Sequence, residues 1–436
     1  MSGVSETLKV ISSKLSRRSF VSALAVAPLG LATLARAEDP ANIGSITSIA
    51  PRIAMQGKLA TKTEVVQGQG QAPMITLGSL SALDGAISMY QEIVAGGGWP
   101  TLAKAKYDKT SKPADIFRLR QRLVREGYLE IDNLADPSAK TFDTTLLTAI
   151  KAFQFNHGAS PNGKIDERTR AEMNISAEAR LYTLQENRPR VAEHLKDLGP
   201  RYVAVNIPAA QLETVELGEI YSRHNVVVGK MERPTPSLKS KVSDIVFNPF
   251  WNAPASIVAR DIIPKYLADP NYLDQLGIRV IDGTNGMEVE PSSVDWQNTP
   301  ADRFQFRQDP GKQNALATMK VNFPNKFMVY MHDTPHRELF AGNARFESSG
   351  CVRVDQVATM INWILNGQDG IDPARIDAIT AAGETLQTKV KNSTDVRFMY
   401  LTAWATEDGR VNFRPDVYKL DGKGFILGQP DPVVAL

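Results

Sequence analysis

The sequence predicts an α+β protein, with helices in the first half of the chain and β-strands in the second half. Apolar residues recur at helical spacing between Leu80 and Val94 and again within residues 113–175. From Tyr202 onward the pattern changes, because residues 202–207 alternate as strands do and later apolar runs are short. A chain of 436 residues is long enough for two or three domains, so we expect the helical and β-rich parts to be separate domains.

The composition is that of an ordinary globular protein, and it argues against a nucleic-acid partner. Hydrophobic residues make up 42% of the chain, charged residues 22%, and the formal net charge is only +2. A protein that binds nucleic acid through its phosphates needs a strong basic field, and neither such a field nor a long run of like charge is present. We therefore expect no nucleic-acid partner.

The first 37 residues have the features of an export signal. A positive region that ends in Arg17-Arg18 is followed by an apolar run at 21–34 and by the small-residue site Ala35-Arg36-Ala37. The apolar run is too short to span a bilayer comfortably, and the residues around the two arginines resemble the twin-arginine signal. We expect residues 1–37 to be removed on export to the periplasm. An uncleaved anchor or a chance basic helix is the alternative.

The rest of the chain divides where composition and periodicity change. The predicted segments are a linker at 38–78, a helical scaffold at 79–112 and 176–198, a three-helix unit at 113–175, a β-rich domain at 199–420 and a tail at 421–436. Within the β-rich domain, residues 252–320 are too long for a plain connection between strands. They also carry a helical signal of their own at 257–276, so we expect a capping subdomain here.

The three-helix unit at 113–175 has a distinctive order of turns. Its first helix ends at Gly127-Tyr128, its second ends in Phe153-Gln154, and an Asn162-Gly163 turn leads into a short third helix. This order resembles the small peptidoglycan-binding domain that is appended to many cell-wall enzymes, and the resemblance implies binding of glycan or stem peptide. A generic three-helix module is the alternative. We expect His157, at the end of the second helix, to be a surface or capping residue.

Cys351 is the single cysteine of the chain, and its surroundings indicate chemistry. One cysteine in an exported protein leaves no internal disulfide, although a buried inert thiol remains the plain alternative. It ends a glycine-containing turn at 348–351, and His332 ends an apolar run at 327–331 that is predicted as a strand. An imidazole near a thiol lowers the cost of forming the thiolate. Gly350 lets backbone N–H groups approach closely enough to form an oxyanion hole.

These residues resemble the L,D-transpeptidase signature, in which a histidine lies a restricted distance before a Ser/Thr-His-Gly-Cys turn. Fifteen residues separate His332 from Ser348, which is within that window, but Ser349 replaces the second histidine. In the family the upstream histidine is taken to be the base, so we expect the replacement to be tolerated. Further stretches resemble a large, capped branch of the family: 227–230, 246–249, 278–280, 310–316 and 401–404. The resemblance extends over roughly residues 80–420.

The resemblance implies a role for each residue of the turn. Cys351 would attack the carbonyl of the third stem residue, form a thioester and release D-alanine, while His332 takes the thiol proton. Gly350 and Cys351 would supply oxyanion N–H groups, with Ser349 beside them at the substrate. Arg353 would pair with a substrate carboxylate or form a structural ion pair. No cofactor and no metal are implied.

The implied partners are peptidoglycan stem peptides, as acyl donor and as amine acceptor, and carbapenems are the implied covalent inhibitors. Two alternatives stay open: an outer-membrane protein or lipoprotein as the acceptor, and a wall-binding protein without catalysis. A zinc site that uses His332 and His336 is disfavoured by Pro335 between them. A serine hydrolase that uses Ser348 or Ser349 is disfavoured because no Gly-x-Ser-x-Gly elbow is present.

Overall fold

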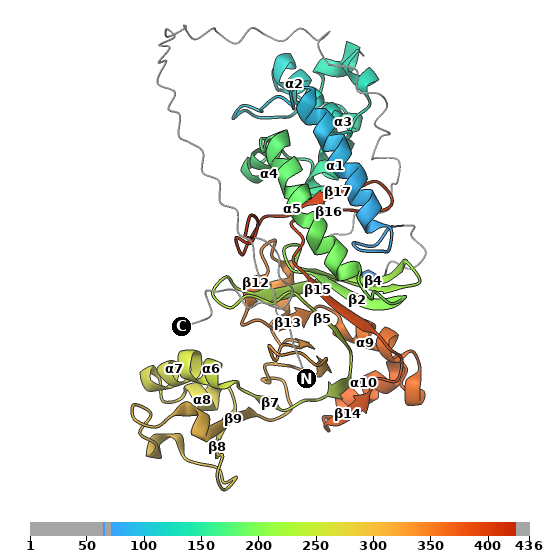
Figure 1. Cartoon of the computed structure of the whole chain (residues 1–436). Coiled ribbons are helices and arrows are strands. Elements are labelled where there is room, and N and C mark those ends of the chain that lie inside the picture. The colour runs from blue at the N-terminus through green and yellow to red at the C-terminus, as the bar shows by residue number, and fades with distance from the viewer. Residues whose placement is uncertain (1–63, 66–70, 136, 424–436) are drawn as a thin grey trace, which may run out of the picture. The chain divides into compact units, whose positions relative to one another are not determined.

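The computed structural model describes residues 64–65, 71–135 and 137–423, and it has the α+β architecture that the sequence predicts (Figure 1). The predicted signal at 1–37 and most of the tail at 421–436 lie outside the described residues. Among the residues described, no helix is long and apolar enough to cross a membrane.

Two long helices form the helical scaffold. Helix α1 (Ser79–Ala95) buries Leu83, Tyr90 and Ile93 at helical spacing, and α5 (Ala177–Leu195) packs beside it. The hairpin of β16 (Ala403–Ala405) and β17 (Val411–Phe413) belongs to the same apolar core. The C-terminal part of the β-rich region therefore returns to complete the scaffold (Figure 1).

The three-helix unit is built from α2 (Pro113–Arg125), α3 (Thr144–Asn156) and α4 (Glu167–Met173), with short 3₁₀ turns at Ile131–Leu134 and Pro137–Lys140. Aspartates cap two of these helices, since Asp143 Oδ1 accepts from Leu146 N at 2.8 Å and Asp166 Oδ1 accepts from Thr169 N at 2.7 Å.

One buried amide explains why the Phe-Gln and Asn-Gly motifs occur together. Gln154 Oε1 accepts from Gly163 N at 2.8 Å, and its Nε2 donates to Lys164 O at 2.8 Å. Gly163 has φ +77°, and a Cβ there would lie 2.2 Å from Leu147 Cδ1. The second helix thus holds the turn that leads into the third, and only glycine fits that turn.

His157 differs from its prediction as a surface residue. It is the C-cap of α3, as expected, but it is fully buried. Its ring stacks on Phe153 at 3.8 Å and on Phe413 at 5.3 Å between ring centroids, and Nε2 lies 3.4 Å from Glu126 Oε1. The three-helix unit and the β16–β17 hairpin pack together around this ring, which the local helical pattern could not indicate.

Twelve strands within the described residues form one curled sheet, in the order β14-β6-β10-β11-β13-β4-β3-β2-β15-β5, with β1 and β12 paired to β4. The strands are β1 (Glu64–Val65), β2 (Arg201–Asn206), β3 (Gln211–Glu216), β4 (Glu219–Gly229), β5 (Leu238–Lys241), β6 (Asp244–Phe247), β10 (Met319–Asn322), β11 (Met331–His332), β12 (Phe346–Ser348), β13 (Val352–Val354), β14 (Leu386–Lys389) and β15 (Asp395–Met399). Helices α9 (Val357–Leu365) and α10 (Pro373–Ala382) contribute to the same core as the sheet.

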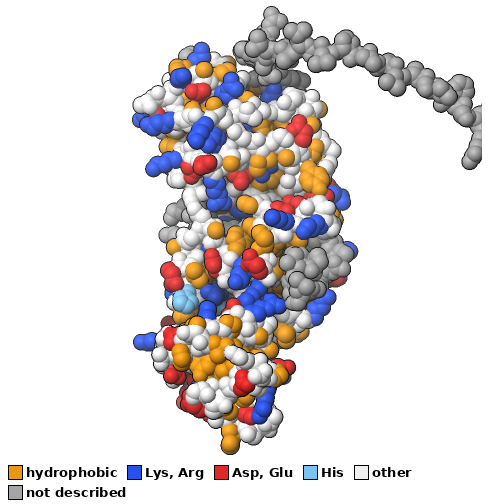
Figure 2. Space-filling view, turned by 90° about the vertical axis from the view of Figure 1, so that its left-hand side faces the viewer, with side chains coloured by type: hydrophobic (Ala, Val, Ile, Leu, Met, Phe, Trp, Pro, Cys, Tyr) orange, Lys and Arg blue, Asp and Glu red, His pale blue; other side chains and the backbone are white. Residues whose placement is uncertain are grey.

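The region predicted as a cap contains a small sheet of its own, in the order β7-β9-β8. It comprises β7 (Trp251–Asn252), α6 (Ala255–Ile257), a π-helical turn (Val258–Ile262), α7 (Ile263–Ala268), α8 (Tyr272–Gln275), β8 (Ile278–Asp282) and β9 (Phe304–Gln308). Trp296 lies at the centre of its separate apolar core, against Phe304 and Phe306. Figure 2 shows hydrophobic side chains gathered on the surface at this end of the molecule.

Three predicted segments differ from the structure. The apolar run at 327–331 is a turn, because Asn325 Oδ1 accepts from the N–H groups of Phe327 and Val329, and only Met331–His332 is a strand. The late strand predicted at 399–404 is split between β15 and β16. Met74 and Ile75, which are apolar residues at the end of the predicted linker, are buried against the sheet.

Candidate active site

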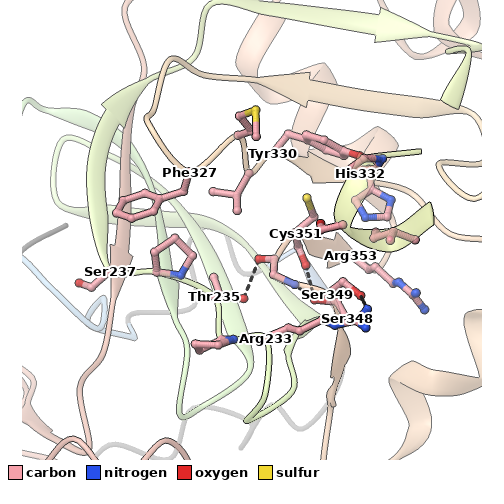
Figure 3. Close-up of a pocket in the computed structure, with 18 of the residues that line it drawn as sticks. Arg233, Thr235, Ser237, Phe327, Tyr330, His332, Ser348, Ser349, Cys351 and Arg353 are labelled. Carbon is pink, nitrogen blue, oxygen red and sulfur yellow. Dashed lines mark hydrogen bonds between the residues drawn. The ribbon is translucent and has the colours of Figure 1, made fainter. Parts of the chain in front are cut away.

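Strand register brings the turn at 348–351 beside the segment that carries His332. Strands β11 and β13 are parallel, with Met331 opposite Val352 and His332 opposite Arg353. Tyr330 and Cys351, one residue earlier on each side, are therefore neighbours. Because side chains alternate between the faces of a sheet, the four residues Tyr330, His332, Cys351 and Arg353 share one face (Figure 3).

That face lines a cavity of about 560 Å³. Residues of the cap and of the segments at 233–237 and 327–330 complete its wall. Within the described part of the chain, the lining includes five basic side chains and no carboxylate: the basic residues are Arg190, Arg233, Arg260, Arg353 and Lys423. A cavity with this charge suits a substrate that carries carboxylates.

Two opposing effects act on the half-buried Cys351 thiol. Burial raises its pKa, because the thiolate is the charged form. The backbone N–H and the hydroxyl of Tyr330 hydrogen-bond to the sulfur, and the positive charges of Lys320 and Arg353 lie nearby, so each of these lowers the pKa. Burial prevails, so the resting group is the neutral thiol, while the surrounding donors are placed to stabilise the thiolate when it forms.

His332 is held as a neutral base. Its Nδ1 lies 2.5 Å from the backbone carbonyl of Asp333, which can only accept, so Nδ1 carries the hydrogen and Nε2 keeps its lone pair. Burial, followed by the charges of Arg353 and Lys320, lowers the pKa of His332 to about 3. His332 and Cys351 line the same cavity and are not hydrogen-bonded to each other in this structure. Such contacts commonly tighten when substrate binds.

Hydrogen bonds of the Ser348 and Thr235 side chains stabilise the turn before Cys351. Ser348 Oγ donates to Cys351 O at 2.6 Å and accepts from Gly350 N at 3.1 Å, and Thr235 Oγ1 donates to Gly350 O at 2.8 Å (Figure 3). Gly350 has φ +115°, a conformation that side chains rarely adopt. Of the two predicted oxyanion donors, the Gly350 N–H is thus already engaged. The Cys351 N–H makes no hydrogen bond with any residue that the structure describes.

Ser349 and Arg353 have different surroundings. Ser349 is exposed, and its Oγ accepts from Arg233 Nη1 at 3.0 Å. The same guanidinium forms an ion pair with Asp261 of the cap. Arg353 has no carboxylate partner within the described part of the chain, and its half-buried guanidinium lines the cavity. The structural ion pair considered for Arg353 is therefore not present among these residues.

The sequence did not single out several residues that contact the site. Tyr330 lies two residues before His332, so alternation along an extended chain could have placed both on one face. Trp251 of β7 hydrogen-bonds through its side chain to Tyr330, which links the cap to the residue that contacts the sulfur. The Lys320 ammonium lies 4.2 Å from the centre of the Tyr330 ring. Strand pairing places Lys320 opposite His332, and no local pattern reveals that pairing.

His336 lies apart from this cluster. It is exposed, and its Nδ1 lies 3.2 Å from Glu338 Oε1, whereas His332 is buried in the cavity wall. The two histidines considered as a metal pair therefore do not face a common point. Ser348 Oγ is occupied within the turn, and Ser349 Oγ bonds to Arg233. Of the side chains considered as nucleophiles, Cys351 is thus the candidate that this arrangement leaves beside the cavity.

Comparison with known proteins assigns both domains. The family model named YkuD, the L,D-transpeptidase catalytic domain, matches residues 200–376. A model described as "Putative peptidoglycan binding domain" matches residues 112–173. A protein of Haemophilus influenzae named "Putative L,D-transpeptidase" is 34% identical over 220 residues, which are 50% of this chain and 44% of that protein. The matched region thus spans less than half the length of this relative.

Two solved structures were also found to be similar. They are L,D-transpeptidases from Xylanimonas cellulosilytica (14% identity, TM-score 0.21, 68% of this chain and 98% of that one) and Stackebrandtia nassauensis (14% identity, TM-score 0.22, 69% and 96%). A structural overlap with TM-scores this low does not support a domain assignment. The assignment of the two domains therefore depends on the family models and the sequence relative. The chain therefore combines a YkuD-type L,D-transpeptidase catalytic domain with a peptidoglycan-binding domain.

Proposed function

We propose that this protein is a peptidoglycan L,D-transpeptidase that uses Cys351 as its nucleophile and forms 3→3 cross-links in cell-wall biogenesis. The observation that supports this most directly is that Cys351, directly before β13, and His332, at the end of the parallel strand β11, line one basic cavity within the matched catalytic domain.

In the acylation step, Cys351 Sγ attacks the carbonyl carbon of the third stem residue, and the thiol proton passes to His332 Nε2. The neutral tautomer of His332 can accept this proton, since Nδ1–H is held by Asp333 O. The Cys351 N–H stabilises the negative oxygen of the tetrahedral intermediate, for which a single donor is typically worth about 2.7–4 kcal/mol. Protonated His332 then returns the proton to the departing amine, and D-alanine leaves.

In the second step an amine attacks the thioester, loses a proton to His332, and releases the thiol. The Tyr330 hydroxyl and N–H stabilise the thiolate as it departs, because both hydrogen-bond to the sulfur. The cap favours aminolysis over hydrolysis by restricting water at the thioester, since Pro254, Ser256 and Ile257 close part of the cavity. A diaminopimelate side chain is the proposed acceptor.

The basic lining supports stem peptides as donor substrates. Arg353 is placed to pair with a substrate carboxylate, because it lines the cavity without a carboxylate partner of its own. Carbapenems, which acylate active-site thiols of this family, are proposed as covalent inhibitors at Cys351. We also propose that the chain works in the periplasm, on the basis of the twin-arginine-like segment at its start.

Product analysis tests the proposed function. Purified wild-type protein and the Cys351→Ala variant are incubated with disaccharide tetrapeptide, and the products are separated and weighed. A dimer that lacks one D-alanine, made by the wild type alone, supports the proposal. A thioester on Cys351 without dimer would direct the acceptor search to outer-membrane proteins, and absence of both products would favour wall binding without catalysis.

A further inference from the structure

A second cavity, of about 370 Å³, lies where four distant parts of the chain meet. These parts are the end of α3 with the start of α4, residues 208–211 with the paired Asn225, the loop at 343–346 before and within β12, and residues 414–417 after β17. None of the residues assigned above to the active site lines it. The two cavities are therefore distinct sites with separate walls.

Among the residues that the structure describes, three guanidinium groups from three different segments line this cavity, and no carboxylate does. They belong to Arg168, Arg345 and Arg414. None of the three forms an ion pair with any carboxylate in the described part of the chain, although most of the arginines described there do. Three positive charges at one cavity without an ion-pair partner are unfavourable, and a bound anion would offset this cost.

Repulsion between these charges acts on Arg414 in particular. Burial, followed by the charges of Arg168, Arg345 and Arg223, lowers the pKa of Arg414 to about 9, while Glu172 acts in the opposite direction. Burial lowers the pKa of Arg345 to about 10, with Asp355 opposing the shift. An anion placed among the three groups would relieve this repulsion directly.

Arg168 and Arg414 each have N–H groups that could donate to a ligand. Arg168 Nη2 donates to Gly158 O at 2.7 Å, and Arg414 Nη1 donates to Asn156 O at 2.9 Å, which orients both groups. Their Nε and remaining Nη groups make no hydrogen bond with a described residue and are not sealed away from solvent. Arg345 is different, because backbone carbonyls such as Val226 O, Gly342 O and Ala210 O engage all of its nitrogens. It supplies fixed positive charge.

Gly158 lets Arg414 take its place in the wall. A Cβ on Gly158 would lie 2.7 Å from Arg414 Cδ and 3.0 Å from its Nε, and Gly158 has φ +66°. The glycine that ends α3 therefore serves the position of this guanidinium as well as the turn.

The rest of the lining fits a peptide better than an inorganic ion. Small or apolar walls alternate with polar groups: Pro208, Ala209, Ala210, Ala344, Phe346 and Val417 are apolar, and Ser160, Gln211, Asn225 and Asn343 are polar. Such a surface accommodates small side chains and peptide groups, while the arginines hold an end carboxylate. Arginine is suited to this task because its planar fork can bind both oxygens of a carboxylate.

We propose that this cavity is a second binding site for a carboxylate-bearing peptide with small side chains. Resting on the proposed function, the ligand is a stem peptide of the peptidoglycan strand held by residues 112–173, because α3 and α4 of that domain form one wall of the cavity. The site would keep the strand attached while another stem occupies the cavity at Cys351.

Calorimetric titration of the full-length protein tests this assignment. The Cys351→Ala background prevents turnover, and the probe is a tetrapeptide stem with free carboxylates. Two binding events are expected in this background. Substituting both Arg168→Gln and Arg414→Gln should remove one event or weaken it at least about tenfold, which is the effect of losing one hydrogen bond to a charged group.

Three comparisons make the result specific. Arg375→Gln is the matched control, since Arg375 is an exposed arginine of α10 outside both cavities, and it should leave both events unchanged. A stem peptide whose carboxylates are amidated should bind weakly to the Cys351→Ala protein with its arginines intact. This binding should be as weak as that of the peptide with free carboxylates to the double arginine variant. Arg168→Glu alone should abolish the same event, and because this side chain is exposed, the variant avoids the half-buried Arg414 position.

Several results would overturn the assignment. Two unchanged binding events in the double variant and in Arg168→Glu would refute it. Binding of inorganic phosphate but not of the peptide would also refute it, because the cavity would then serve another anion. Failure of the proposed function looks different: the arginine-dependent event would persist, while wild-type protein with Cys351 intact would form neither thioester nor dimer.

Discussion

The Tyr330→Phe substitution tests how the site generates its thiolate. The tyrosine hydroxyl hydrogen-bonds to Cys351 Sγ and lowers the pKa of the thiol, and Trp251 contacts the same hydroxyl from the cap. Phenylalanine keeps the ring, so the packing against Lys320 and His332 should persist. The substitution therefore removes the hydroxyl donor and little else.

The magnitude follows from the charge of the acceptor. A hydrogen bond to a charged group is worth roughly 1.5–3 kcal/mol, and one pKa unit is about 1.36 kcal/mol, so the thiol pKa should rise by about one to two units. The thiolate fraction at neutral pH then falls about 10- to 100-fold. Because nucleophilicity rises with pKa at a Brønsted slope of about 0.45, the net loss in thiol reactivity is roughly 4- to 12-fold.

The assay is the rate of Cys351 alkylation by iodoacetamide as a function of pH, read from the mass of the intact protein. The single cysteine of the chain makes this readout unambiguous. The variant should reach half-maximal rate at a higher pH than the wild type. Tyr182→Phe, at a tyrosine that is 49% exposed and outside the cavity, should leave the profile unchanged. An identical profile for Tyr330→Phe would refute the role given to the hydroxyl.

Three further predictions concern the turn and the buried histidines. Gly350→Ala should lower the free energy of unfolding by about 1–3 kcal/mol and reduce turnover, because φ +115° is strained for alanine; urea unfolding and dimer formation measure both. Ser349→Ala should keep turnover within a few-fold of wild type in the same dimer assay, since its hydroxyl bonds to Arg233 rather than to the reacting atoms, and a loss of 100-fold would contradict this. Burial lowers the pKa of His157 and of three further histidines, so the unfolded chain binds protons that the folded chain does not. Stability should be complete above about pH 6.5 and fall by about 1.4 kcal/mol per histidine per pH unit below it, as urea midpoints at pH 7.5 and 5.5 would record. The three further histidines are His194, His224 and His332, with pKa values of about 3, 4 and 3.

The sequence predicted what depends on local pattern and on a distinctive motif. The helices that become α1, α2 and α5 were apparent from apolar spacing, because each buries one face. The residues 348–351 and His332 indicated the site through chemistry that needs those side chain types together. The family comparison confirms the L,D-transpeptidase domain, while the roles of the individual site residues remain predictions.

The sequence could not predict what depends on the pairing of distant segments. Tyr330 contacts Cys351 because β11 and β13 are parallel and in one particular register. His157 is buried because Phe413, from a distant hairpin, packs on its ring. The second cavity joins Arg168 to Arg414, which no periodicity relates. The prediction of a strand at 327–331 was wrong for a local reason. The Asn325 side chain accepts hydrogen bonds from the backbone of this segment and holds it in a turn.

The central claim is that Cys351 carries the acyl group of the stem peptide. The most direct measurement is the intact mass of the full-length protein, quenched in acid during incubation with disaccharide tetrapeptide. A mass increase equal to the peptide minus D-alanine, located on Cys351 and absent from Cys351→Ala, is the predicted result. Dimer formation by Cys351→Ala, or an adduct on any other residue of the wild type, would contradict the account.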